Sequence, residues 1–108
     1  MKTGDIILIP FPFAELNNKK VRPAVVITET DDKYKDIVVA AISSVVPSKL
    51  SKREILLNPD KINNLRADSI LKSDRIMTLK REDKIADLGS LSPIKLFEFS
   101  AILTDMVK

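Results

Sequence analysis

The sequence predicts one mainly β domain with small helices, folded as a compact barrel with a C-terminal helix. Short apolar runs of strand length follow one another closely, and clusters of Pro, Asn, Asp and Ser separate them. Only the C-terminal segment carries a longer apolar pattern of helical period. Because the chain has 108 residues and neither repeat nor linker, we expect a single domain over residues 1–108.

The N-terminal strands are predicted from their apolar runs. DIILIP (5–10) predicts the first strand, and the prolines that follow favour a long loop that exposes Phe11 and Phe13. Residues 21–28 predict the second strand. IVVAAIS (37–43) predicts a third strand that is apolar on both faces and therefore central in the sheet.

The middle of the chain predicts shorter elements. REILLN (53–58) reads as a fourth strand. The segment 58–64 is predicted to form a short helix, with Asn58 as its N-cap and Pro59 at its first position. Residues 68–72 and 75–79 predict one or two further strands.

Two helices are predicted near the C-terminus. The first covers residues 81–88 and ends at Gly89. The last begins at Ser92 and Pro93, and it has apolar residues on two stripes. The stripe expected to face the barrel consists of Ile94, Phe97, Ala101 and Ile102. The second flank, expected to be left uncovered and to form a two-fold dimer, consists of Leu96, Phe99, Leu103 and Met106.

Composition excludes several classes of site. Without cysteine or histidine the chain has no disulfide framework, no thiolate metal site and no imidazole base. We expect no metal and no cofactor. The formal net charge of +3 permits a polyanionic partner, and the N-terminal sequence lacks a signal-peptide pattern, which favours a cytoplasmic protein.

The candidate functional residues stand at predicted strand ends. Arg22 precedes Pro23 in NNKKVRPAVVI, so it is held extended beside the core, where its guanidinium suits phosphate. Taken alone it also fits a surface arginine that covers a strand end. Serines close the third strand, and a polar turn interrupts ILKSDRIMTL. The candidates there are Ser43, Ser44, Lys72, Asp74 and Arg75.

One reaction suits such a set of residues. RNA supplies its own nucleophile, the 2′-hydroxyl, so an enzyme needs only to align it, stabilise charge on the phosphate and move two protons. Arginine supplies the charge and a serine hydroxyl can donate to phosphate. A carboxylate can act as base and a cation as acid. For Lys72 and Asp74, a solvated ion pair in a turn is the competing interpretation.

Four segments resemble the MazF/PemK/Kid family of toxin endoribonucleases, particularly its PemK-like branch. They are GDIILIPFPF (4–13), KVRPAVVI (20–27), IVVAAISS (37–44) and DSILKSDRIMTL (68–79). The resemblance implies an SH3-like barrel of the CcdB/MazF/Kid type and a homodimer. It also implies metal-independent, sequence-specific cleavage of single-stranded mRNA to 2′,3′-cyclic phosphate and 5′-hydroxyl ends, and inhibition by a cognate antitoxin.

The resemblance also assigns residues. Arg22 falls on the family's catalytic arginine and Ser43 on its catalytic hydroxyl. Lys72 and Asp74 fall on a catalytic pair that is arginine and aspartate in Kid-like members. Additional RNA contacts are expected from Lys19, Lys20, Ser44, Arg75 and Phe13.

Two other functions are compatible with this fold class. CcdB-like toxins share the barrel and poison gyrase through protein contacts, so fold alone does not settle function. The other alternative hypothesis is an SH3-like interaction module without enzymatic activity. Aromatic residues are only 5% of the chain, which is too few for an aromatic peptide-binding groove. Arg22 and Ser43 favour the nuclease, since a protein poison needs neither.

Overall fold

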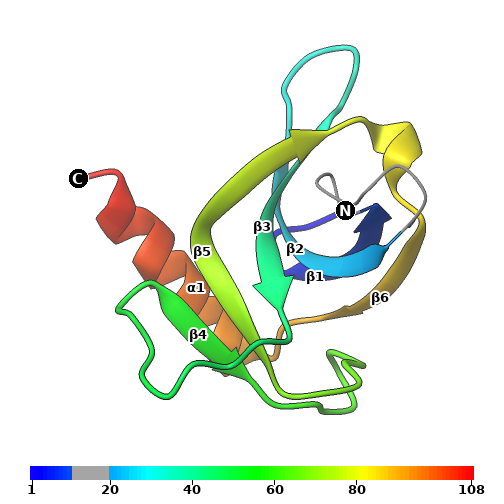
Figure 1. The fold of residues 1–108 in the computed structure, drawn as a ribbon. Helices are drawn as coiled ribbons and strands as arrows, with labels where there is room; N and C mark the ends of the chain where they lie inside the picture. The colour runs from blue at the N-terminus through cyan, green and yellow to red at the C-terminus, as the bar shows by residue number, and fades with distance from the viewer. Residues whose placement is uncertain (11–19) are drawn as a thin grey trace.

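The computed structural model describes residues 1–10 and 20–108. It confirms the mainly β fold with one C-terminal helix (Figure 1). The predicted long loop with Phe11 and Phe13 lies outside the described residues. The elements are β1 (Asp5–Pro10), β2 (Val21–Glu29), β3 (Ile37–Ser43), β4 (Glu54–Leu57), β5 (Ser69–Leu79), the 3-10 helix η1 (Arg81–Asp83), β6 (Ala86–Ser90) and α1 (Pro93–Met106).

The six strands form one antiparallel sheet in the order β4-β5-β3-β2-β1-β6. The sheet curls around itself into a half-barrel, and α1 lies outside it beside β4 and β5 (Figure 1). The central position predicted for the third strand is confirmed, because β3 pairs with β2 on one side and β5 on the other.

The core has two layers, one on each face of the sheet. Neighbouring residues of β1 belong to different layers, as strand geometry requires: Ile6 packs with Phe99 of α1, whereas Ile7 packs with Val26 and Val39. Both layers consist mainly of branched aliphatic side chains, which suit a pleated, buried surface. By strand alternation, Arg22 lies on the same face of β2 as Ala24 and Val26 of the second layer, and Ser43 lies on the same face of β3 as Val39.

The helix predicted over residues 58–64 is wrong; this segment forms turns. Side chains form hydrogen bonds with backbone amide and carbonyl groups of this segment. The Asp60 carboxylate accepts hydrogen bonds from the amides of Ile62 and Asn63, at 2.8 and 2.6 Å. The Asn63 side chain is buried; it donates to the carbonyl of Asn58 and accepts from the amides of Asp60 and Leu65. Asx-type bonds of this kind compete directly with helix formation.

The helix predicted over residues 81–88 is also wrong. Only the three residues of η1 are helical, and β6 follows it. β1 needs a hydrogen-bonding partner on its second edge, and β6 supplies it, so tertiary pairing overrides the local helical signal. Gly89, expected to end the helix, instead pairs with Ile6 in the sheet. A Cβ at Gly89 would lie 2.4 Å from the carbonyl oxygen of Ile62, so only glycine permits this approach.

The predicted C-terminal helix is confirmed, with Ser92 as its N-cap and Pro93 as its first residue. Its predicted orientation is wrong except at Ile102, which packs on the core as expected. Phe99 is fully buried, and Leu96, Ile102 and Leu103 pack on the same core layer. The outer side consists of Ile94 and Phe97, 71% and 76% exposed, and of exposed Ala101. In the described ranges, no helix is long and apolar enough to cross a membrane.

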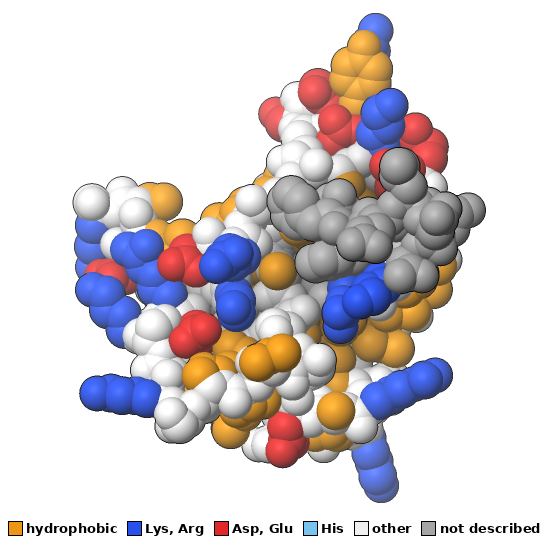
Figure 2. All heavy atoms as spheres, in the orientation of Figure 1, with side chains coloured by type: hydrophobic (Ala, Val, Ile, Leu, Met, Phe, Trp, Pro, Cys, Tyr) orange, Lys and Arg blue, Asp and Glu red, His pale blue; other side chains and the backbone are white. Residues whose placement is uncertain are grey.

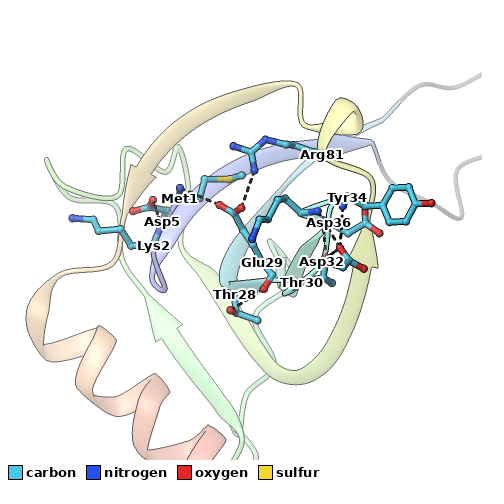
Figure 3. A network of polar contacts seen from close by, with 11 residues as sticks. Met1, Lys2, Asp5, Thr28, Glu29, Thr30, Asp32, Tyr34, Asp36 and Arg81 are labelled. Carbon is cyan, nitrogen blue, oxygen red and sulfur yellow. Dashed lines mark hydrogen bonds and ion pairs between the residues drawn. The ribbon is translucent and has the colours of Figure 1, made fainter.

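A polar network ties the N-terminus to the end of β2 (Figure 3). The Glu29 carboxylate lies 3.3 Å from the terminal amine of Met1 and 2.8 Å from Arg81 Nη1. The hydrogen bond from the terminal amine contributes most, and the one from Arg81 adds to it; together they hold the pKa of Glu29 below its usual value. In the adjoining turn, the Asp32 carboxylate accepts from the Thr30 hydroxyl and from two backbone amides, which lowers its pKa as well.

Candidate functional site

The register of β2 and β3 brings Arg22 next to Ser43. Ala24 on β2 pairs with Ala41 on β3, and the strands are antiparallel. The same register, continued by two residues on each strand, sets Arg22 opposite Ser43. Opposed residues project from the same face of a sheet. The spacing between VRPA and AAIS in the sequence therefore places a guanidinium and a hydroxyl side by side.

β5 completes the site from the other side of β3. Lys72 pairs with Ala41, so Ala24, Ala41 and Lys72 form a row across three strands. The small alanine side chains leave room between the longer ones, and a pocket of about 450 Å³ opens there. We call it the Arg22 pocket. Its lining consists of Arg22, Ala41, Ile42, Ser43, Ser44, Val45, Lys72, Arg75, Ile76 and Met77.

A bulge in β5 shapes this pocket. Ala40 and Ala41 are neighbours on β3, yet their partners on β5 are Ile76 and Lys72, with residues 73–75 inserted between them. A bulge interrupts the alternation of side chains and redirects them. It explains how side chains on both sides of the insertion line one pocket.

The bulge separates Arg75 from Asp74. An uninterrupted strand would set Lys72 and Asp74 on one face, as the sequence suggests. Here Arg75 lines the pocket together with Lys72, whereas Asp74 is not among the lining residues. The Asp74 carboxylate lies 4.0 Å from Nη1 of Arg53, and both side chains are substantially exposed.

The remaining candidates have different positions. Ser44 lines the Arg22 pocket. Lys20 is exposed just before β2 and does not line it. Lys19 and Phe13 lie outside the described residues.

The Ser43 hydroxyl is oriented by the backbone. Its oxygen accepts a hydrogen bond of 3.1 Å from the amide of Val45. A hydroxyl has one proton to donate, and this acceptor bond leaves that proton for another group. Ser43 can therefore donate to an oxygen placed in the pocket.

The pocket is cationic and partly apolar. Arg22, Lys72 and Arg75 line it, and no carboxylate is among the lining residues that the structure describes. Val45 and Ile76 form exposed apolar walls. Figure 2 shows Lys and Arg side chains at several places on this face, with exposed hydrophobic side chains between them. Three cations, a hydroxyl donor and apolar walls suit a phosphate group attached to an organic moiety.

Comparison with known proteins identifies the family. A family model described as PemK-like, MazF-like toxin of type II toxin-antitoxin system matches residues 2–107. The chain belongs to this toxin family. No curated protein matches the chain significantly.

Solved structures of MazF-like toxins share the fold. The chain resembles an endoribonuclease in complex with its cognate antitoxin, from a mycobacterial species, with a TM-score of 0.75 and 12% identity over 99% of this chain and 94% of the other. It also resembles the Mycobacterium tuberculosis toxin MazF-mt6, with a TM-score of 0.66 and 17% identity over 94% and 93% of the two chains. The MazF-like fold implied by the sequence motifs is thereby confirmed.

For this MazF/PemK toxin, sequence reasoning missed the apolar part of the pocket. Val45 follows the serines that close β3, and Ile76 follows the polar SDR turn. An apolar residue directly beside candidate phosphate ligands was the available signal. Sequence reasoning also missed that Asp74 does not line the pocket. The polar residues of the SDR turn indicate an interruption there, but only the pairing of β5 with β3 fixes which side chains it redirects.

Proposed function

We propose that this toxin is a metal-independent, sequence-specific endoribonuclease that cleaves single-stranded mRNA in the cytoplasm. The observation that carries the proposal is the convergence of Arg22, Ser43, Lys72 and Arg75 on one pocket. The family supports it, since a structural relative at 12% identity is itself described as an endoribonuclease.

The proposed reaction is an internal transesterification. The 2′-oxygen attacks the adjacent phosphorus, the bond from phosphorus to the 5′-oxygen breaks, and the products carry a 2′,3′-cyclic phosphate and a 5′-hydroxyl. Arg22 and Arg75 stabilise the negative charge that builds on the phosphate oxygens, and Ser43 donates a hydrogen bond to one of them. Lys72 binds or protonates the leaving 5′-oxygen.

Ser43 gives the first test of this arrangement. Ser43→Ala is expected to slow cleavage by roughly ten- to a hundredfold, the effect of one lost donor of about 1.5–3 kcal/mol to a charged group. Ser43→Thr keeps the hydroxyl and should be nearly silent. Single-turnover cleavage rates of the three proteins on one RNA measure this. Equal rates for serine and alanine would transfer the role to Ser44 or to backbone groups.

We propose Asp74, which the family resemblance places in the catalytic pair with Lys72, as the group that takes the 2′ proton. Hydrogen bonds of a catalytic group are often long before substrate binds, so its place beside Arg53 does not exclude this role. We expect Asp74→Asn to remove the acidic limb of the pH–rate profile, because an amide cannot accept the 2′ proton. Cleavage rates from about pH 4 to 8 measure this limb. An acidic limb identical to that of the wild type would show that another group is the base.

The toxin is also proposed to act as a homodimer. On α1, the uncovered large apolar side chains are Ile94 and Phe97 rather than the flank that the sequence predicted. Exposed apolar patches of this kind mark interfaces. Phe97→Ser should weaken the dimer at least tenfold, measured by light scattering across a dilution series. Tyr34→Ser, which alters a 63% exposed aromatic on the β2–β3 loop, is the control and should not. A wild type that is monomeric at micromolar concentration would contradict the proposal.

A cognate antitoxin is the proposed protein partner. The Arg22 pocket combines three cations with exposed apolar walls. An acidic segment with apolar side chains can therefore occupy the site that we assign to RNA. A structural relative is in complex with its own cognate antitoxin.

The function is tested by incubating the purified toxin with labelled single-stranded RNA in EDTA. We expect cleavage at defined positions, and no cleavage of DNA of the same sequence, which lacks the 2′-hydroxyl. A DNA gyrase supercoiling assay runs in parallel. Intact RNA together with inhibited gyrase would replace the proposal with the CcdB-like, non-enzymatic alternative.

A further inference from the structure

A second pocket lies next to the Arg22 pocket on the other face of β2. It has a volume of about 380 Å³, and we call it the Asn64 pocket. Its apolar walls come from β1, β2, β6 and the segment before β5: Leu8, Val21, Pro23, Leu65 and Leu88. None of the roles assigned above uses these walls.

The two pockets meet at the end of the sheet. Ser44, directly after β3, lines both. On β2, Val21 and Pro23 line the Asn64 pocket, whereas Arg22 between them lines the other, in keeping with the alternation of side chains along a strand. When a phosphate of an RNA strand binds at Arg22, the adjoining nucleotide can therefore reach the Asn64 pocket.

The wall formed by residues 58–69 is held by many hydrogen bonds. The turn around Asp60 and Asn63 is bonded internally, and Asn58 donates to the Asp68 carboxylate at 3.0 Å. The wall is also fixed to β6: Ser90 donates its amide to Ile62, and the missing side chain of Gly89 permits the close contact. The pocket is therefore preformed, which lowers the entropic cost of binding.

Polar groups stand around the apolar walls. The side-chain NH2 group of Asn64 donates to the Leu88 carbonyl at 2.8 Å, so the side-chain oxygen of Asn64 remains as an acceptor. The Ser69 hydroxyl donates to the carbonyl of Ala67 and can accept in turn. Arg66 is exposed at the pocket and contributes a planar guanidinium with several donors. Ser44 adds a hydroxyl.

We propose that the Asn64 pocket binds the base of the nucleotide adjoining the scissile phosphate and contributes to cleavage specificity. Apolar walls suit the faces of a base, and the acceptors and donors at the rim suit its edge; splayed bases of single-stranded RNA are read in this way. The inference rests on the proposed ribonuclease function. It assigns Asn64 and Arg66 to base recognition, distinct from the phosphate ligands Arg22 and Arg75.

The binding test uses the whole isotope-labelled toxin and backbone NMR shifts. The probes are inorganic phosphate and 2′-deoxy dinucleotides, which lack the attacking hydroxyl. Phosphate should shift only amides of the Arg22 pocket, such as Ser43 and Arg75. Dinucleotides should also shift Asn64, Arg66 and Leu88. Dinucleotide shifts confined to the Arg22 pocket would overturn the inference alone; no shifts with either probe would overturn the proposed function together with it.

A matched pair of variants tests specificity. Arg66→Ala removes a cation at the pocket, and Lys61→Ala removes an exposed cation from the same loop that does not line it. Sequencing the ends of cleaved RNA should show that Arg66→Ala relaxes base preference at one position beside the cut by roughly 5- to 150-fold, the discrimination that a good side-chain contact to a base gives. Lys61→Ala should keep the wild-type preference. An unchanged preference in Arg66→Ala would contradict the proposed base contact.

Discussion

Replacing Arg22 with alanine is expected to slow RNA cleavage by roughly 10²- to 10³-fold while the fold stays intact. Arg22 occupies the extended position before Pro23, opposite Ser43 in the continued register of β2 and β3. A preorganised donor aimed at developing charge contributes about 2.7–4 kcal/mol in comparable sites. Rates under single-turnover conditions measure the loss, and circular dichroism checks the fold.

Two further variants make the Arg22 result specific. Arg22→Lys keeps the charge but loses the guanidinium fork, so it should also cleave poorly. Lys61→Ala removes one positive charge from an exposed side chain that does not line the Arg22 pocket, and it should cleave at nearly the wild-type rate. If Arg22→Ala cleaved RNA as fast as Lys61→Ala, the phosphate-binding role of Arg22 would be excluded.

The largest expected effect on stability comes from Phe99. Its side chain is fully buried, at 0% relative exposure, where α1 packs on the sheet. Phe99→Ala should lower the free energy of unfolding by about 3–5 kcal/mol, because it removes a large buried side chain and leaves a cavity. Urea unfolding followed by circular dichroism measures the change.

The control for Phe99 is another aromatic residue. Tyr34→Ala changes a side chain that is mostly exposed, so its effect should stay within about 0.5 kcal/mol. If Phe99→Ala does not fold, Phe99→Leu should fold with a smaller loss, since it retains most of the apolar volume. Equal stability of the Phe99→Ala and Tyr34→Ala proteins would contradict the packing of α1 described above.

The strands from β1 to β5 were predictable because their signals are local. IVVAAIS is apolar on both faces, and β3 occupies the central position with the predicted bounds 37–43. Residues 58–64 and 81–88 carry local helix signals as well, but other partners take their backbone groups. Side chains of Asp60 and Asn63 do so in the first segment, and β1 does so in the second.

The orientation of α1 was not predictable from its periodicity. Apolar residues occur on two sides of the helix, so the pattern allows either side to face the sheet. The structure selects the side with Phe99, and it leaves Phe97 exposed. Where both stripes are apolar, the choice depends on shape complementarity with the sheet, which the sequence of the helix alone does not contain.

The candidate site was predictable in part: the sequence indicated Arg22 and Ser43, but not which side chain of the polar turn lies beside Lys72. Arg22 and Ser43 stand at strand ends whose register brings them together. Pairing with β3 introduces the bulge in β5, so the side chain that lines the pocket beside Lys72 is Arg75 rather than Asp74. Predictions about residues two apart depend on an uninterrupted strand, and a bulge removes that condition.

Cleavage of an RNA with a single 2′-deoxynucleotide on the 5′ side of the cut tests the central claim most directly. The claim is that the pocket of Arg22, Ser43, Lys72 and Arg75 promotes attack by the substrate's own 2′-hydroxyl without a metal ion. In EDTA, the all-ribose RNA should yield 2′,3′-cyclic phosphate and 5′-hydroxyl ends by mass spectrometry, and the deoxy-substituted RNA should not be cut at that position. Cutting of the deoxy-substituted RNA at the same position, or cleavage that requires Mg²⁺ and leaves 5′-phosphate ends, would contradict the account.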